Sequence, residues 1–427
     1  MALPTRSLLI AILAIAIGFY KFYIHDAFIL FFGIGRVIQP LEDFPEYHCH
    51  RIQHPLLESC EDVWLDEKGR TLYAACSNVA TRAAWSPGGN TYDLAARAAA
   101  GGGTDHITVL DIDKPESDGM HSVRALEFRD DKGDVQELDL HGFDVRSIDN
   151  GRRLRFWLIN HRPPVDASTQ EPIKDATKVG ANSTIEVYDL EMSRGTRSNN
   201  YLVHVKTITS DTLISPNNLV VIDDDDNRGG FLFTNDKSNK VPPIPGLPPL
   251  FGSGSVAYCR TDTGQCHFAG TNNFSIPNGI TRDPFSGLIY VAQSGSATVS
   301  VHKLTNDEKL VQVDEVRLPM SLDNLSIDSD GNVFAGAFPD VAQFMKAFHD
   351  PHGTKAPSTV LMIRKKESNN EIYGPNVEHQ VIKIVEDAEA KVLPTTTTAV
   401  HDPVSGRLFL GGVASSFLGV CEKQEHL

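Results

Sequence analysis

One short unit recurs along the body of this chain and constrains its fold more than any other feature. The unit is an Asp-led turn that contains Gly, followed by a run of β-forming residues, which is the pattern typical of a β-hairpin. Its six copies are DEKGRTLYAACS (66–77), DNGRRLRFWLIN (149–160), DNRGGFLFTND (226–236), DPFSGLIYVAQ (283–293), DSDGNVFAGAF (328–338) and DPVSGRLFLGGV (402–413). Such repetition across the whole body indicates radial repetition of one supersecondary unit. The sequence therefore predicts an all-β fold, a six-bladed β-propeller, with an irregular pair of β-sandwiches as the alternative.

Four long insertions separate these units and are expected to lack strands. They cover residues 81–104, 162–181, 237–254 and 340–358. The last begins with DVAQFMKAFHD, which predicts a short amphipathic helix. Long loops in a compact domain usually serve as lids or binding loops. We therefore expect one domain.

The charge balance limits the classes of partner. Across 427 residues, 39 Lys and Arg stand against 55 Asp and Glu, which gives a net charge of −16. Because binding to phosphates needs a basic face, this balance argues against a nucleic-acid partner. Carboxylates instead suit hard cations. An apolar fraction of 41% and a charged fraction of 22% exclude a disordered or fibrous chain.

The N-terminus resembles a targeting segment. Leu8–Tyr20 is an apolar run behind Arg6, with the length of a signal-peptide core. No A-x-A cleavage site separates it from a second apolar patch, Ala27–Ile34, so a retained signal or signal-anchor is favoured over a cleaved one. The expected organisation is residues 1–38 as this segment and residues 39–427 as the propeller domain.

This targeting segment places the chain in the secretory pathway, membrane-anchored or secreted, with its main domain lumenal or extracellular. Membrane association through the N-terminal segment is part of this expectation. Oxidising surroundings permit disulfides. Three glycosylation acceptors make the chain a candidate glycoprotein: Asn182, Asn273 and Asn324.

Small clusters of carboxylate and amide side chains stand near the ends of the predicted strands. They are Glu61-Asp62, Asn217-Asn218, Asn235-Asp236, Asn278 and Asp323-Asn324. In a propeller such positions approach the central channel, where several blades can direct oxygen ligands at one ion. Ca²⁺ takes six to eight oxygen ligands in irregular geometry. Taken singly, each cluster is also explained by the preference of Asn and Asp for turns. Serine-hydrolase, zinc-helix, Walker and dinucleotide motifs are missing from the sequence.

Eight segments in order resemble the serum paraoxonase/arylesterase family of calcium-dependent lactonases, in a divergent form. The resemblance runs from about Cys49 to Cys421. It is carried by CEDVWL (60–65), LHGF (140–143), LINH (158–161), SPNNLVVI (215–222), FTND (233–236), IPNGI (276–280), LDNLSID (322–328) and GNVFAGAFPD (331–340). The family implies a six-bladed propeller with two calcium ions in its central tunnel.

The resemblance also implies which residues hold these ions. The catalytic calcium would be held by Glu61, Asn217, Asn278, Asp323 and Asn324. A second, structural calcium would use Asp62, the backbone carbonyl of Phe143, and Asn218. Asn218 departs from the family pattern, which has Asp there; the lost charge leaves this second site weaker or empty. If Asn324 binds calcium, it carries no glycan.

Two histidines fall where the family has a catalytic dyad, His141 in LHGF and His161 in LINH. One imidazole would remove a proton from water while the other orients it. Calcium would stabilise the developing oxyanion of a lactone or aryl ester substrate. Without the resemblance, two structural histidines at strand ends would be the simpler interpretation.

The family also implies a closing disulfide between Cys49 and Cys421. The remaining cysteines are paired by spacing alone, Cys60 with Cys76 and Cys259 with Cys266, and strand geometry decides whether either bond forms.

Two other functions remain open at this point. One is an enzyme of the strictosidine-synthase type, which shares the propeller without the calcium ligands. The other is a propeller that only binds, since a fold does not by itself imply catalysis.

Overall fold

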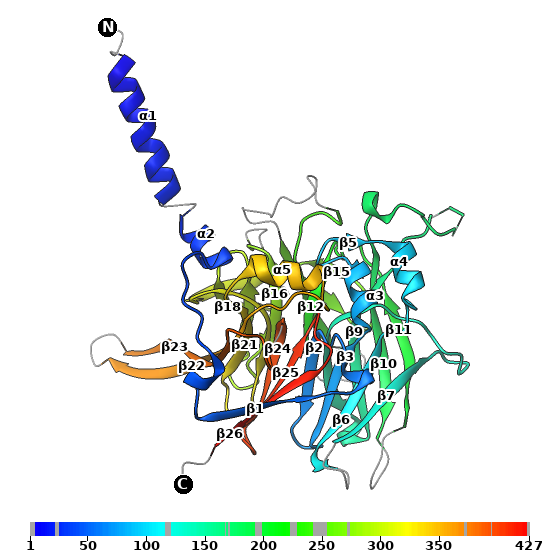
Figure 1. The fold of residues 1–427 in the computed structure, drawn as a ribbon. Helices are drawn as coiled ribbons and strands as arrows, with labels where there is room; N and C mark the ends of the chain where they lie inside the picture. Colours follow the sequence, from blue (N-terminus) through cyan, green and yellow to red (C-terminus); the bar gives the residue numbers. More distant parts are fainter. Residues whose placement is uncertain are drawn as a thin grey trace.

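The structure is a computed structural model that describes residues 5–21, 25–115, 121–166, 168–169, 171–192, 199–222, 229–241, 254–270, 274–370, 374–393 and 395–424. Strands dominate this part of the chain, so the predicted all-β class is confirmed (Figure 1). The strands form six four-stranded antiparallel units.

The six units follow one another along the chain. The first contains β2 (Asp62–Asp66), β3 (Thr71–Cys76), β6 (His106–Pro115) and β7 (His121–Arg129). The second contains β8 (Leu140–Ile148), β9 (Arg153–Arg162), β10 (Asn182–Glu191) and β11 (Tyr201–Ile208). The third contains β12 (Pro216–Val221), β13 (Gly230–Asn235), β14 (Ser255–Arg260) and β15 (Cys266–Phe268). The outer strands β7 and β11 pair in parallel and join the first two units into one eight-stranded sheet.

The fourth unit contains β16 (Pro277–Arg282), β17 (Ile289–Gln293), β18 (Thr298–Leu304) and β19 (Leu310–Arg317). The fifth contains β20 (Ser321–Ile327), β21 (Val333–Phe338), β22 (Ser358–Asn370) and β23 (Gly374–Asp387). The sixth contains β24 (Thr396–Asp402), β25 (Arg407–Gly412), β26 (Leu418–Lys423) and β1 (Tyr47–Ile52). Each predicted Asp-led turn lies between the first two strands of a unit, although residues 223–228 of the third turn fall outside the described residues.

The first strands of the units meet around a common centre. Strand β2 contacts β8, and the contacts continue from β8 to β12, β16, β20 and β24, which returns to β2. These six inner strands therefore form a closed ring, here called the hub. Apolar clusters fill the space between neighbouring units; Val299 and Val301 of the fourth unit, for example, pack with Leu361 and Ile363 of the fifth.

Two glycines allow the inner strands to approach closely. A Cβ atom on Gly142 of β8 would lie 2.5 Å from the Asn217 carbonyl oxygen. One on Gly279 of β16 would lie 2.3 Å from the Leu325 backbone nitrogen. Since backbone atoms cannot move aside, larger residues at these positions would push neighbouring units apart.

The two ends of the body close the ring. Strand β1 pairs with β26, and in this register Cys49 lies opposite Cys421. The two cysteines form a disulfide, as the family resemblance implied. The pairings based on spacing, Cys60–Cys76 and Cys259–Cys266, are also present.

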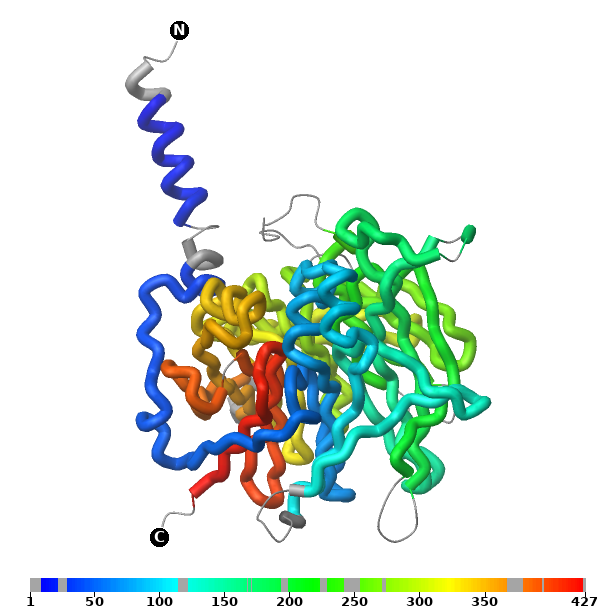
Figure 2. Tube along the Cα trace, turned by 45° about the vertical axis from the view of Figure 1, so that its right-hand side comes forward, coloured from blue at the N-terminus to red at the C-terminus, as the bar shows by residue number. Residues whose placement is uncertain are grey.

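The N-terminal segment contains α1 (Thr5–Phe19) and α2 (His25–Phe32). In Figures 1 and 2, α1 extends away from the sheets. Arg36 ties the following residues to the body, since it donates to the carbonyl of Pro339 and to that of Pro319 at 2.8 Å. Within the described residues, no helix is both long and apolar enough to span a membrane. The boundary at residue 38 and the targeting role stay predictions.

The insertions carry short helices on the side of the body where α2 lies (Figure 1). The predicted amphipathic helix is α5 (Val341–His349), which Asp340 caps by accepting from the Gln343 amide. The expectation that residues 81–104 lack strands was wrong. This region holds most of α3 (Val79–Ala84), then α4 (Leu94–Ala99) and the hairpin of β4 (Trp85–Ser86) and β5 (Thr91–Tyr92). One-turn helices occur at Leu41–Asp43, Pro55–Leu57, Asp149–Gly151 and Ala176–Lys178.

Candidate functional site

The residues expected to bind calcium all lie at the starts of inner strands. Glu61 directly precedes β2, and the others belong to β2, β8, β12, β16 and β20. Residues more than 250 positions apart in sequence are therefore neighbours at the hub.

A recurrent irregularity at the strand starts explains this convergence. In β12, Pro216 pairs with Asn235 and Leu219 with Phe233, so that Asn217 and Asn218 together oppose one residue. The same two-against-one bulge holds His141-Gly142 in β8, Asn278-Gly279 in β16 and Asp323-Asn324 in β20. A bulge interrupts the alternation of side chains and redirects them. It thereby allows consecutive side chains to reach the same centre.

Direct contacts connect Glu61 with Asn324. The side-chain amide of Asn324 donates to Glu61 Oε1 at 2.8 Å and to the Glu61 carbonyl at 3.2 Å. The Thr397 hydroxyl donates to the same carbonyl at 2.7 Å. These contacts fix the Glu61 backbone while one oxygen of its carboxylate remains free for another partner.

Three buried oxygens at the hub lack a hydrogen-bond partner within the part of the chain that the structure describes. They are Glu61 Oε2, Asn217 Oδ1 and Asn278 Oδ1. Buried acceptors without a donor are costly, so such a group indicates a missing electropositive partner. Mixed carboxylate and amide oxygens are the donor set of Ca²⁺. The described residues contain no metal-binding cluster of three or more His, Cys, Asp or Glu side chains, so the amides are essential to this interpretation.

The electrostatics of the hub agree with a cation. Burial, with Asp62 and Asp323 nearby, raises the pKa of Glu61 well above its usual range. Burial likewise raises the pKa of Asp323 to about 8 and that of Asp62 to about 7. A bound cation would favour the ionised forms and reverse these shifts.

The second predicted set does not fit a cation in the same way. Asp62 Oδ1 accepts from the Val63 amide at 2.9 Å, and Asp62 Oδ2 accepts from the Phe143 amide at 3.1 Å. Asn218 Nδ2 also donates to Asp62 Oδ2, at 3.2 Å. Thus each Asp62 oxygen already accepts a hydrogen bond from a neutral donor, and the contact of Phe143 with Asp62 is made by its N–H.

The two predicted histidines lie together, His141 on the inner strand β8 and His161 on the neighbouring strand β9. Their ring centroids are 5.1 Å apart in an edge-to-face arrangement. His141 Nε2 lies 3.9 Å from Glu61 Oε1, and His161 Nδ1 lies 2.9 Å from the Ser183 hydroxyl. His141 Nδ1 and His161 Nε2 have no partner among the described residues. Burial lowers the pKa of His161 to about 3 and that of His141 well below its usual range, so both imidazoles are neutral near pH 7.

The sequence analysis placed Asp236 in a cluster of candidate cation ligands without assigning it to either ion, and it gave Lys237 no role; both residues follow β13. Asp236 Oδ1 is buried without a partner in the described part of the chain, and its charge contributes to the raised pKa of Asp323. The Lys237 ammonium donates to the Pro87 carbonyl and, at 2.8 Å, to Asn90 Oδ1. It thereby holds the β4–β5 hairpin over the histidines, where the Cβ of an alanine at Gly88 would lie 3.3 Å from His141. The FTND motif at 233–236 was the available sequence signal.

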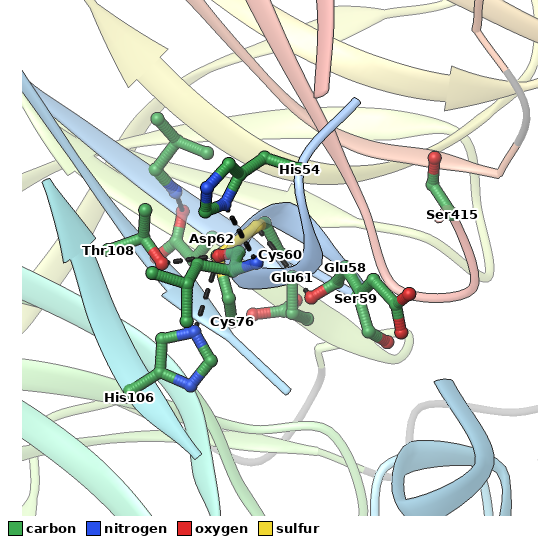
Figure 3. Close-up of a disulfide and its surroundings, with 12 residues drawn as sticks. His54, Glu58, Ser59, Cys60, Glu61, Asp62, Cys76, His106, Thr108 and Ser415 are labelled. Atoms are coloured by element: carbon green, nitrogen blue, oxygen red, sulfur yellow. Dashed lines mark hydrogen bonds between the residues drawn. A yellow bond between two sulfur atoms is a disulfide. The ribbon is translucent and has the colours of Figure 1, made fainter. Parts of the chain in front are cut away.

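The segment that leads into Glu61 is fixed by a disulfide. Figure 3 shows the bond between Cys60 and Cys76, with Glu61 and Asp62 directly after Cys60. Ser59 adopts a left-handed backbone conformation with φ of 49° and donates its amide to the Ser415 carbonyl at 2.6 Å. The segment is therefore held to β3 on one side and to the sixth unit on the other.

The glycosylation acceptors differ in exposure. Asn324 is buried and hydrogen-bonded, which makes it a poor acceptor in the folded chain. Asn182, the first residue of β10, is half-buried. Asn273 lies outside the described residues.

Comparison with known proteins identifies relatives for most of the body. A family model described as Arylesterase matches residues 173–380. Serum paraoxonase/arylesterase 2 of Gallus gallus is 26% identical over 295 residues, which cover 68% of this chain and 71% of that protein. The protein of the same name from Homo sapiens is 25% identical over 283 residues, which cover 60% and 71%. Serum paraoxonase/lactonase 3 of Oryctolagus cuniculus is 26% identical over 253 residues, which cover 56% and 63%.

Solved structures overlap most of the chain with low similarity. Streptogramin B lyase has a TM-score of 0.43 and 9% identity, with coverage of 88% of this chain and 98% of the lyase. A gluconolactonase from Xanthomonas campestris has a TM-score of 0.32 and 15% identity, with coverage of 67% and 86%. At these TM-scores neither match defines the fold of this chain.

Proposed function

This chain is a divergent relative of the serum paraoxonase/arylesterase family, and from that premise we propose that it is a calcium-dependent hydrolase of lactones and aryl esters. The observation that carries the proposal is a set of three buried oxygens, from the starts of three inner strands, that have no partner in the described part of the chain. They belong to Glu61, Asn217 and Asn278, which are members of the expected catalytic ligand set.

The same set accommodates one cation. Glu61, Asn217, Asn278, Asp323 and Asn324 would hold it, since Asn324 Oδ1 accepts one hydrogen bond and retains a second lone pair. When bound, calcium supplies a Lewis acid that polarises the ester carbonyl and stabilises negative charge on its oxygen.

The histidines would move the proton. His141, neutral near pH 7, would accept a proton from water as the water oxygen bonds to the carbonyl carbon. The resulting imidazolium would lie 3.9 Å from Glu61 Oε1, which would stabilise it when ionised. His161, anchored to Ser183, would orient the His141 ring. Because burial makes the imidazolium a strong acid, it would return its proton to the leaving oxygen as the ester C–O bond breaks.

Substitution of the calcium ligands tests the first part of this proposal. Glu61→Gln and Asn278→Ala should weaken calcium binding, measured by titration calorimetry, by about 10- to 100-fold or more, and turnover of γ- and δ-lactones should fall with it. Glu186→Gln is a matched control, because Glu186 is a buried carboxylate of β10 that accepts from Thr184 and Thr207 outside the hub. Full turnover in excess EDTA would reject calcium dependence.

A separate experiment tests the dyad. His141→Gln should retain calcium binding but lose about 10²- to 10⁴-fold in kcat, the range of general-base catalysis. His302→Gln replaces a buried histidine of β18 outside the hub and should leave kcat unchanged. A His141→Gln variant with an unaltered pH–rate profile would remove the histidine from the mechanism.

The architecture and location belong to the same proposal. The closed ring of inner strands supports an assignment of the six units as the blades of a six-bladed β-propeller. Three disulfides support a lumenal or extracellular main domain, secreted or anchored through residues 1–38. Protection of the body from added protease in sealed microsomes would test the lumenal location. Release or retention of the protein after carbonate washing would distinguish a secreted from an anchored form.

A further inference from the structure

Asn218 connects two other residues of the hub through its side-chain amide. Its Nδ2 donates to Asp62 Oδ2 at 3.2 Å and to Asn324 Oδ1 at 2.7 Å. Its Oδ1 accepts from the Leu219 backbone amide at 2.7 Å. Since that backbone group can only donate, the Leu219 contact determines which side-chain atom is oxygen and which is nitrogen. The amide therefore presents donors, and not a ligand oxygen, to Asp62.

Each oxygen of Asp62 already accepts from a neutral donor. Three N–H groups, from Val63, Phe143 and Asn218, serve its two oxygens. By contrast, Glu61, Asn217 and Asn278 each retain an oxygen without a partner in the described part of the chain. The hub thus contains one group of oxygens that requires a cation and an adjoining group that does not.

We infer that the Asn218 amide occupies the place of a second cation, so that the hub binds one calcium ion and not two. This inference rests on the proposed function for the first ion. An aspartate at position 218 would direct an anionic oxygen at Asp62, and two buried carboxylates in contact require a cation or a proton between them. The asparagine side chain adds no charge, and from β12 it joins Asp62 of β2 to Asn324 of β20 by hydrogen bonds.

The contacts of Asn218 do not depend on a metal ion. The three inner strands stay connected through Asn218 when calcium is removed. Removal of calcium by a chelator should therefore empty the site formed by Glu61, Asn217 and Asn278. The hydrogen bonds that join the inner strands through Asn218 should remain. A second, structural ion would make folding depend on metal instead.

The test replaces Asn218→Asp in the full chain and counts calcium. Protein equilibrated with calcium is passed through gel filtration in buffer with a low, fixed calcium concentration, and the metal per chain is measured by plasma mass spectrometry. We expect one calcium per chain for the wild type and two for N218D. Asn78→Asp is the control: Asn78 is an exposed residue that caps α3 by accepting from the Ala80 and Thr81 amides, so this variant adds one negative charge outside the hub. It should bind one.

A melting experiment provides a second readout that does not depend on activity. In EDTA, N218D should melt at a lower temperature than the wild type, and added calcium should raise its melting temperature by more than that of the wild type. If N218D is recovered only in the presence of calcium, the same metal count on that material applies, and two ions per chain would support the inference.

The outcomes separate the two proposals. Two calcium ions in the wild type, or one in N218D, would overturn the inference and leave the proposed hydrolase intact. No calcium in the wild type would reject the proposed calcium dependence. In that case one calcium per chain in N218D would still support the role of the Asn218 amide. An N218D variant that binds no calcium would overturn it.

Discussion

The disulfide between Cys60 and Cys76 forms immediately before Glu61, an acidic residue whose Oε2 has no partner among the described residues. Both cysteines are buried among apolar side chains of the first and sixth units. The Glu61 amide donates to the Ala75 carbonyl at 3.0 Å, next to Cys76. The bond therefore fixes the position from which this carboxylate enters the hub.

We predict that the double substitution Cys60→Ala/Cys76→Ala weakens calcium binding by about tenfold or more, in the range seen when supporting residues of metal sites are changed. It should also cost about 3 kcal/mol of unfolding free energy, because the closed segment spans 16 residues. Calorimetry and urea unfolding measure the two effects. Cys259→Ala/Cys266→Ala removes a disulfide from β14 and β15 and should lower stability alone. Equal calcium affinity in both double variants would contradict the prediction.

Lys237 should control the mobility of the β4–β5 hairpin. Lys237→Met removes the donor shared by the Pro87 carbonyl and Asn90 Oδ1. The carbonyl keeps the Asn90 amide at 3.1 Å and Asn90 is exposed, so we expect a cost of about 0.5–1.5 kcal/mol. We expect faster hydrogen exchange at residues 85–92 and a raised KM, with calcium binding retained. Lys309→Met is the control, since that exposed lysine donates to the Phe268 carbonyl at the outer edge of the body. Unchanged exchange in the hairpin would show that Lys237 does not hold it.

His302 should contribute to the decrease in the free energy of unfolding at acidic pH. Burial lowers its pKa to about 4, from about 6.5 in the unfolded chain. Between these values the unfolded state binds the proton and the folded state does not, so stability falls as the pH decreases from about 6.5 to about 4.

Replacement of this residue should remove that dependence. The difference in unfolding free energy between the wild type and His302→Leu should change by up to about 1.4 kcal/mol per pH unit within this window and stay constant above it. Urea unfolding at a series of pH values measures the difference. A constant difference from pH 4 to 7 would show that the histidine titrates normally.

Gly279 should be intolerant of a side chain. A Cβ there would meet the Leu325 nitrogen at 2.3 Å and Asn324 Cα at 2.6 Å, so Gly279→Ala must displace β20 from β16. We expect a loss of about 1–3 kcal/mol, read from thermal melting, together with weaker calcium binding. Gly270→Ala is the control, since its nearest neighbour would be Phe274 at 3.5 Å, an ordinary contact. Equal melting temperatures for the two variants would contradict this account of the ring.

The repeated turn made the hairpins predictable, because Asp, Gly and the following β-formers act locally. The clusters near the strand ends also indicated which residues would meet, since the start of each inner strand faces the same centre. The short helix at residues 341–349 followed from its amphipathic pattern in the same way.

What the sequence left open depends on register and on distant contacts. The bulges that direct Asn217 and Asn218 at the hub arise from the pairing of β12 with β13, which no local pattern specifies. The donor role of Asn218 requires β2 and β20 to lie on either side of it. Lys237 reaches a carbonyl 150 positions away, and a lone lysine gives no sign of that partner.

The pairing of β1 with β26 also bears on how the protein is made. A ribosome delivers the histidines and every acidic side chain of the hub well before Leu418–Lys423 emerge. Until that last strand is available, the sixth unit lacks one of its four strands, and the nascent chain has to keep an open edge from premature association. Synthesis of β26, rather than of the candidate calcium ligands, is therefore the event that encloses the centre.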